Sequence, residues 1–122
     1  MNTERRKTVR FLPRTEAYVA LRPDFTKLGR LINISKGGLA FRYLAHQRPG
    51  QAPTHLDLFA GNDTFYLSRI PCRVIYDIRL SEKQRSSASL ERRRCGLEFG
   101  EITEAQATQL ELYLKNHVAG EA

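Results

Sequence analysis

The stretch Asn33–Phe41 reads Asn-Ile-Ser-Lys-Gly-Gly-Leu-Ala-Phe (NISKGGLAF), in which small polar residues precede two glycines and an apolar run. Because side chains alternate between the two faces of a strand, Asn33 and Ser35 are predicted to share one face. Ile32 and Ile34 are then predicted to share the other face. Two hydrogen-bonding side chains are therefore expected to project side by side at the end of a strand.

The glycines Gly37 and Gly38 indicate a tight turn. Glycine adopts positive φ without steric cost, and its missing Cβ also allows another molecule to approach the backbone closely. Alternating residues on both sides predict a hairpin of strands 28–34 and 39–43 around this turn. On this stretch alone, an ordinary hairpin is the favoured interpretation.

The same alternation of apolar and polar residues extends over most of the chain. Further strands are predicted at residues 16–22, 55–60, 64–67, 72–80 and 94–99. Pro71 is expected to introduce the strand at 72–80. The small and charged residues 81–92 are expected to form a flexible connection.

The C-terminal part has the pattern of a helix over about residues 103–118. Thr103 and Gln106 have the spacing of a capping box, in which each side chain satisfies a free N–H group at the helix start. Apolar residues at helical spacing form one stripe: Ala107, Leu110, Leu114 and Val118. About six short strands followed by one amphipathic helix predict a mainly β fold, a small antiparallel barrel with the helix packed against it.

Positive charge is concentrated in the first part of the chain. Residues 1–50 hold eleven Lys or Arg against three Asp or Glu, whereas the remainder holds nine against ten. A localised positive field favours an anionic partner such as a nucleotide, nucleic acid or membrane phosphate, and a solvated basic tail is the alternative. By length the chain is one domain, with a flexible basic arm at 1–14 and the barrel with its helix at 15–122.

Enzymatic and metal-binding patterns are not found in the sequence. Cys72 and Cys95 are too few for a disulfide framework and lack zinc-ligand spacing, and the three histidines are scattered. We expect no catalytic residue, no metal and no cofactor. No apolar run is long enough to span a bilayer and no signal-peptide pattern follows the N-terminal charges, so a cytoplasmic location is expected.

The basic arm contains the pattern R-x-x-x-R, formed by Arg6 and Arg10 and preceded by Arg5. A guanidinium group can donate two parallel hydrogen bonds to the O6/N7 edge of guanine, bind a phosphate, or stack on a base. Two such groups on one flexible arm could clamp a nucleotide. Alone, the pattern is common in arginine-rich segments.

R-x-x-x-R followed by N-x-S-x-x-G, which here spans Asn33 to Gly38, resembles the signature of the PilZ domain family. The resemblance extends to the strand-rich middle, the closing strand CGLEF and the C-terminal helix. It implies a six-stranded antiparallel β-barrel with a helical lid. It also implies binding of the bacterial second messenger cyclic di-GMP.

The resemblance gives roles to individual residues. Arg6 and Arg10 are expected to contact guanine edges and phosphates. Asn33 and Ser35 are expected to hydrogen-bond the ligand from the barrel surface, and Gly38 is expected to let the backbone turn close to it. A ligand with two phosphates and two guanines suits arginines and amide groups.

Two further residues complete the expected site. Gly37 belongs to the same turn. Arg5 occupies the position before R-x-x-x-R, which in PilZ domains is thought to influence how many ligands bind. A third cation there would lower the repulsion among four phosphates, so two stacked cyclic di-GMP molecules are expected.

Alternatives remain at this point. A small barrel could bind single-stranded nucleic acid, with bases stacked on the aromatic residues Phe41, Tyr43, Phe65 or Tyr66. The chain could also be a protein-interaction module without a ligand. For a cyclic di-GMP receptor, the signal is expected to pass to a separate, unidentified partner protein.

Overall fold

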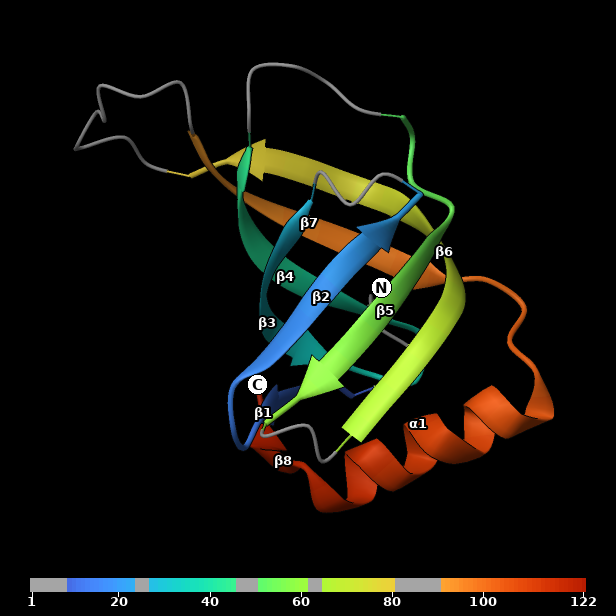
Figure 1. Ribbon diagram of the computed structural model, residues 1–122. Helices are drawn as coiled ribbons and strands as arrows, with labels where there is room; N and C mark the ends of the chain where they lie inside the picture. Colours follow the sequence, from blue (N-terminus) through green and yellow to red (C-terminus); the bar gives the residue numbers. More distant parts are fainter. Residues whose placement is uncertain (1–8, 24–26, 46–50, 62–64, 81–90) are drawn as a thin grey trace, which may run out of the picture.

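The computed structural model of the chain describes residues 9–23, 27–45, 51–61, 65–80 and 91–122 (Figure 1). In chain order the elements are β1 (Phe11–Pro13), β2 (Ala17–Arg22), β3 (Leu28–Ile34), β4 (Gly38–Ala45), β5 (His55–Ala60), β6 (Phe65–Arg79), β7 (Glu91–Phe99), α1 (Glu104–Asn116) and β8 (Val118–Glu121). Arg5, Arg6 and most of the predicted connection at 81–92 lie outside the described residues.

Six of the strands form a closed antiparallel barrel. Their order is β2-β5-β6-β7-β4-β3, and β2 also pairs with β3, which closes the sheet on itself. The two short strands β1 and β8 extend the sheet beyond β3. The prediction of a six-stranded antiparallel barrel with a C-terminal helix is confirmed.

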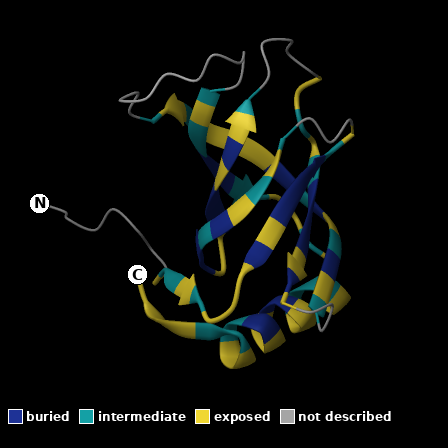
Figure 2. Cartoon of the chain, turned by 60° about the vertical axis from the view of Figure 1, so that its left-hand side comes forward, coloured by how far each residue is buried: buried dark blue, intermediate teal, exposed yellow. Residues whose placement is uncertain are grey.

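The barrel interior is filled with apolar side chains, so buried and exposed residues alternate along the strands (Figure 2). The helix α1 lies across one end of the barrel, at the bottom of Figure 1. Its Tyr113 is fully buried, with its ring centroid 5.1 Å from that of Phe65 and 5.3 Å from that of His117. The helix therefore caps the core, as apolar burial at a barrel end requires.

The predicted capping box of α1 is confirmed. Gln106 N donates to Thr103 Oγ1, and Thr103 N donates to Gln106 Oε1, both at 3.0 Å. Gln106 Nε2 also donates to the carbonyl oxygens of Ser68 and Arg69, which ties the helix start to β6. No helix in the described part of the chain is long and apolar enough to cross a membrane.

Strand β6 is longer than the sequence predicts. The strands predicted separately at 64–67 and 72–80 are one strand, which pairs with β5 as far as Pro71 and with β7 beyond it. Pro71 lacks an N–H group and is therefore typical of a strand boundary, but here it marks the point where β6 changes its partner strand. Strand β7 also starts at Glu91, so the end of the predicted connection 81–92 is a strand.

Two short strands were not predicted. Phe11–Pro13, at the end of the segment expected as a basic arm, pairs with β3 and β8. The helix stops at Asn116, and the prediction that Val118 continues its apolar stripe is wrong, because Val118 begins β8. β8 gains hydrogen bonds from β1, a partner more than 100 residues earlier in the chain.

A bulge in β3 changes which side chains share a face. The register with β4 shifts by one residue between Leu31 and Asn33. Leu31 and Ile34 both lie in the core, whereas Ile32 is only partly buried and is not part of it. The prediction that Ile32 and Ile34 share a face is wrong, because the extra residue of a bulge reverses the alternation.

Candidate ligand-binding site

Arg10 and Asn33 meet beside the end of β3. Arg10 Nη1 donates a hydrogen bond to Asn33 Oδ1 at 2.9 Å, although the two residues are 23 positions apart. The Asn33 residue is 8% exposed, and Arg10 is partly buried. Since Ile34 points into the core, the neighbouring Asn33 side chain lies on the outer wall. One arginine of R-x-x-x-R and the first residue of N-x-S-x-x-G are therefore in direct contact.

The backbone of Arg10 is held from the C-terminal end of the chain. Ala122 N donates to the Arg10 carbonyl oxygen at 2.9 Å, and Arg14 N donates to the His117 carbonyl oxygen at 2.8 Å. Between these two bonds, Phe11 pairs with Ile34 of β3 as well as with β8. The strand β8 thus fixes the segment that presents Arg10 to Asn33.

Ser35 builds the turn that follows β3. Its backbone N–H donates to the Gly38 carbonyl oxygen at 2.8 Å, and its Oγ accepts a hydrogen bond from Gly37 N at 3.1 Å. The hydroxyl also lies 3.4 Å from the Gly38 carbonyl oxygen, and the residue is 2% exposed. A hydroxyl has one donor and two acceptor sites, so these contacts within the described residues leave one acceptor site unused.

Gly38 is needed for packing rather than for an unusual backbone angle. A Cβ built on it would lie 2.1 Å from the Leu97 carbonyl oxygen on the paired strand β7. Its φ is not positive; among the described residues, the glycine with positive φ is Gly61. The expectation of a positive-φ turn is therefore wrong for Gly38. Gly37 contributes through its backbone, because its carbonyl oxygen accepts from Phe99 N at 2.9 Å.

Small residues lie beside Asn33 across the outer wall. Asn33 pairs with Ala40 on β4, Ala40 pairs with Gly96 on β7, and Gly96 pairs with Tyr76 on β6. The Tyr76 ring covers Gly96, since a Cβ there would lie 2.2 Å from a ring carbon. Ala40 and Gly96 are both buried, so the Tyr76 ring forms the outer surface of this row at β7. Sequence reasoning missed Ala40, Gly96 and Tyr76, because only strand pairing brings them beside Asn33.

The sequence-predicted site residues are thus partly placed. Arg10 touches Asn33, Ser35 and Gly37 lie in the turn after the same strand, and Gly38 is the first residue of β4. Arg5 and Arg6 lie outside the described residues. Their roles stay predictions.

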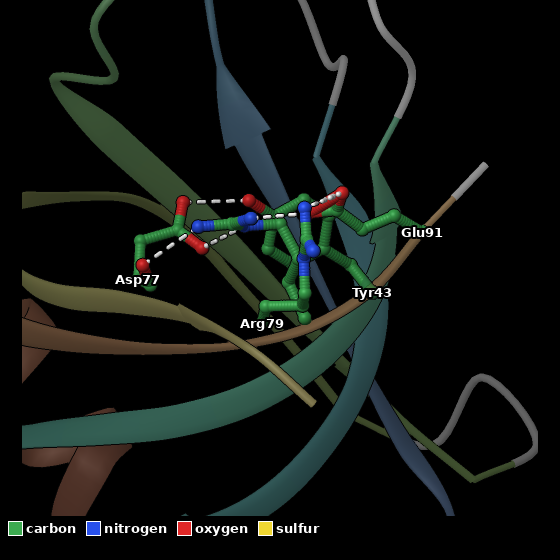
Figure 3. A network of polar contacts seen from close by, with 5 residues as sticks. Tyr43, Asp77, Arg79 and Glu91 are labelled. Carbon is green, nitrogen blue, oxygen red and sulfur yellow. Dashed lines mark hydrogen bonds and ion pairs between the residues drawn. The ribbon is translucent and has the colours of Figure 1, made fainter. Parts of the chain in front are cut away.

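A polar network lies farther along β4, β6 and β7 (Figure 3). Tyr43 Oη donates to Asp77 Oδ2 at 2.6 Å, and Arg93 Nε donates to Asp77 Oδ1 at 2.8 Å. Glu91 accepts from Arg93 and forms an ion pair with Arg79. Burial, followed by the Asp77 hydrogen bond, raises the pKa of Tyr43 well above its ordinary value. The network joins three strands and uses the single hydrogen-bond donor of the Tyr43 hydroxyl.

The aromatic residues suggested for stacking on bases are mostly unsuited to it. Phe41 is 0% exposed and Tyr43 is 6% exposed, so both belong to the core. Phe65 packs against Tyr113, and only Tyr66 of the four is exposed, at 51%. Phe41 and Tyr43 therefore cannot stack on bases, because stacking needs exposed rings.

The two cysteines are buried thiols. Burial raises the pKa of Cys72 to about 11 and, with a smaller effect of the Asp77 charge, that of Cys95 to about 12. A nucleophilic cysteine needs a lowered pKa and access, which neither has. Within the described residues, no group of three or more His, Cys, Asp or Glu side chains is placed to hold a metal ion.

The chain is a small domain built on a closed six-stranded β-barrel with a helical cap. It carries polar residues at the end of β3, where Arg10 contacts Asn33 on the outer wall. The family model for the PilZ domain matches residues 4–116 of the chain. The chain belongs to the PilZ domain family.

Solved structures share this fold at low sequence identity. The PilZ domain of YcgR from Escherichia coli, solved with c-di-GMP, is 14% identical with a TM-score of 0.61, covering 88% of this chain and 87% of that one. MrkH, described as a c-di-GMP-dependent transcription regulatory factor, is 18% identical with a TM-score of 0.65, covering 92% of this chain and 50% of that one. The Bacillus subtilis inhibitor of motility MotI/DgrA is 20% identical with a TM-score of 0.59, covering 93% and 50%.

The matches cover only part of several of these solved chains. The chain spans half the length of MrkH and of MotI/DgrA, and 46% of the longer YcgR chain solved with c-di-GMP. No curated protein matches the sequence. The common feature is the PilZ barrel.

Proposed function

We propose that this chain is a receptor for cyclic di-GMP. The observation that carries the proposal is the 2.9 Å hydrogen bond from Arg10 to Asn33, because it joins residues of both signature motifs on one patch of the barrel wall. Membership of the PilZ family supports it, as does the likeness to the YcgR domain that was solved with c-di-GMP.

The chemistry of the patch suits such a ligand. A guanidinium has five N–H donors, and Arg10 uses one of them on Asn33, so the others remain for guanine N7 and O6 or for phosphate oxygens. The Asn33 amide supplies two N–H donors and an acceptor. Arg6, and the acceptor site left on Ser35, would add to these contacts. The ligand would lie against the wall beside Asn33.

We propose that the bound domain acts through another protein and performs no catalysis of its own. In this proposal the ligand is a signal and no cofactor takes part, and the site of action is the cytoplasm. The buried, protonated thiols fit this role, since neither can serve as a nucleophile.

Two stacked ligand molecules per chain are part of the proposal. Four phosphates in one site repel each other, and Arg5 would add a positive charge beside R-x-x-x-R. Calorimetric titration of wild type is expected to give two ligands per chain, falling to one in Arg5→Leu. One ligand per chain in both proteins would contradict the stacked pair.

A selectivity panel tests the proposed function. Thermal unfolding is measured with cyclic di-GMP, cyclic di-AMP, GTP or RNA. A ligand at 100 times its dissociation constant stabilises a protein by about 2.7 kcal/mol, which raises the melting temperature by several degrees. Only cyclic di-GMP is expected to do so. A shift with GTP or RNA but none with cyclic di-GMP would overturn the proposal.

A further inference from the structure

Three arginines face one another across neighbouring strands of the outer wall. Arg30 of β3 pairs with Arg42 of β4, and Arg42 pairs with Arg94 of β7. Arg42 lies between the buried core residues Phe41 and Tyr43, so its own side chain points outward. We call Arg30, Arg42 and Arg94 the arginine strip.

The strip is only partly neutralised by the protein. Arg30 Nη2 forms an ion pair with Glu16 at 3.1 Å, and Arg94 Nε donates to the uncharged Tyr76 hydroxyl at 3.1 Å. Arg42 is exposed, and in the part of the chain that the structure describes it has no ion pair or side-chain hydrogen bond. Like charges at directly opposite positions destabilise a sheet. Repulsion within the strip therefore lowers the stability of the unliganded barrel.

The strip runs beside the candidate site. Arg42 is two residues from Ala40 on β4, and Arg94 is two residues from Gly96 on β7, on the same outer face. Two residues along a strand span about 7 Å, which is less than the width of a dinucleotide. Since Ala40 is the strand partner of Asn33, a nucleotide bound at Asn33 would therefore reach the strip.

We propose that the arginine strip binds phosphate groups of the nucleotide ligand and that Arg42 makes the main contact. This inference rests on the proposed function, because it names a further part of the same site. Guanidinium groups form paired, charge-assisted hydrogen bonds with phosphate oxygens. Among the described residues Arg42 is the member of the strip without a side-chain partner, and its neighbours Arg30 and Arg94 add to the positive field.

The test is calorimetric titration of cyclic di-GMP into the full chain and its Arg42→Gln variant, at low and at physiological salt. The variant is expected to bind about tenfold more weakly at physiological salt, as loss of a charge-assisted hydrogen bond predicts. Its affinity should also depend less on salt, because one charge has left the site. Lys115→Gln, which removes a positive charge from α1, serves as the matched control and should bind like wild type.

Unliganded melting temperatures separate binding from folding. Arg42→Gln should melt at the same temperature as wild type or higher, since it relieves repulsion within the strip. Equal affinities for wild type and Arg42→Gln would contradict phosphate binding by the arginine strip but would leave the receptor function intact. A lower melting temperature of unliganded Arg42→Gln, large enough to explain its weaker binding by loss of folded protein, would also contradict phosphate binding by the strip. Absence of binding by wild type would contradict the receptor function itself.

Discussion

At the scale of single residues, Arg10 and Asn33 form the contact on which the candidate site depends. Arg10→Ala is expected to weaken cyclic di-GMP binding by about 1–3 kcal/mol, the range for a bidentate guanine contact. The unliganded protein should lose no more than about 0.5–1.5 kcal/mol, the contribution of one hydrogen bond. Titration and denaturant unfolding of the same sample measure both. A loss of stability as large as the loss of affinity would mean that Arg10 is structural.

A substitution at Gly38 tests whether close packing against β7 requires glycine at this position. Gly38→Ala places a Cβ 2.1 Å from the Leu97 carbonyl oxygen, so β4 and β7 must separate. Overpacking of this kind costs about 1–3 kcal/mol of unfolding free energy. Gly120→Ala is the control, because nothing lies within 4 Å of its Cβ. Equal melting temperatures for the two variants would show that the strands have room.

The sequence predicts the types of residue in the site better than their surroundings. The motif places Asn33 near the end of a strand and Gly37 in the turn after it, as observed, whereas Ser35 already belongs to the turn and Gly38 is the first residue of β4. It does not reveal the bulge at Ile32, because a bulge depends on the register of the partner strand. The row from Asn33 to Tyr76 depends on pairing among four strands, which a linear pattern does not contain.

At the scale of elements, β8 positions the segment that carries Arg10. Removing residues 119–122 keeps the partly buried Val118 but deletes the Ala122 hydrogen bond to the Arg10 carbonyl oxygen. The shortened chain should fold and bind cyclic di-GMP more weakly, by no more than Arg10→Ala does. The two changes act on the same contact, so their effects on affinity should be less than additive. Fully additive losses would show that β8 acts elsewhere.

Element boundaries show where local patterns fail. The capping box at Thr103 fixes the helix start from sequence, because both partners lie within four residues. The end of the helix is different, since Val118 fits an apolar stripe and also a strand, and pairing with β1 decides between them. Pro71 likewise marks a change of strand partner and not the start of a strand.

At the scale of the whole molecule, the closed barrel holds both thiols in its core, and this makes stability depend on pH. Burial raises the pKa of Cys72 to about 11 from an ordinary value of 9.0. A group whose pKa is higher in the folded state contributes stability below its unfolded pKa and loses it as the pH rises toward the folded value. Unfolding free energy should therefore fall by about 1 kcal/mol for each thiol between pH 9 and 10.

Denaturant unfolding at several pH values measures this decline. The double variant Cys72→Ala, Cys95→Ala should show a shallower decline over the same range. An equally steep decline in the variant would assign the effect to other groups.

Cyclic di-GMP is expected to bind on the outer wall where Arg10 meets Asn33. Amide chemical-shift mapping of the wild-type chain during titration tests it most directly, because it reports location as well as binding. Saturable shifts are expected at Asn33, Ser35, Ala40 and Gly96, with the opposite wall at Phe59 unchanged. Shifts confined to Phe59 and its neighbours, or none at saturating ligand, would contradict it.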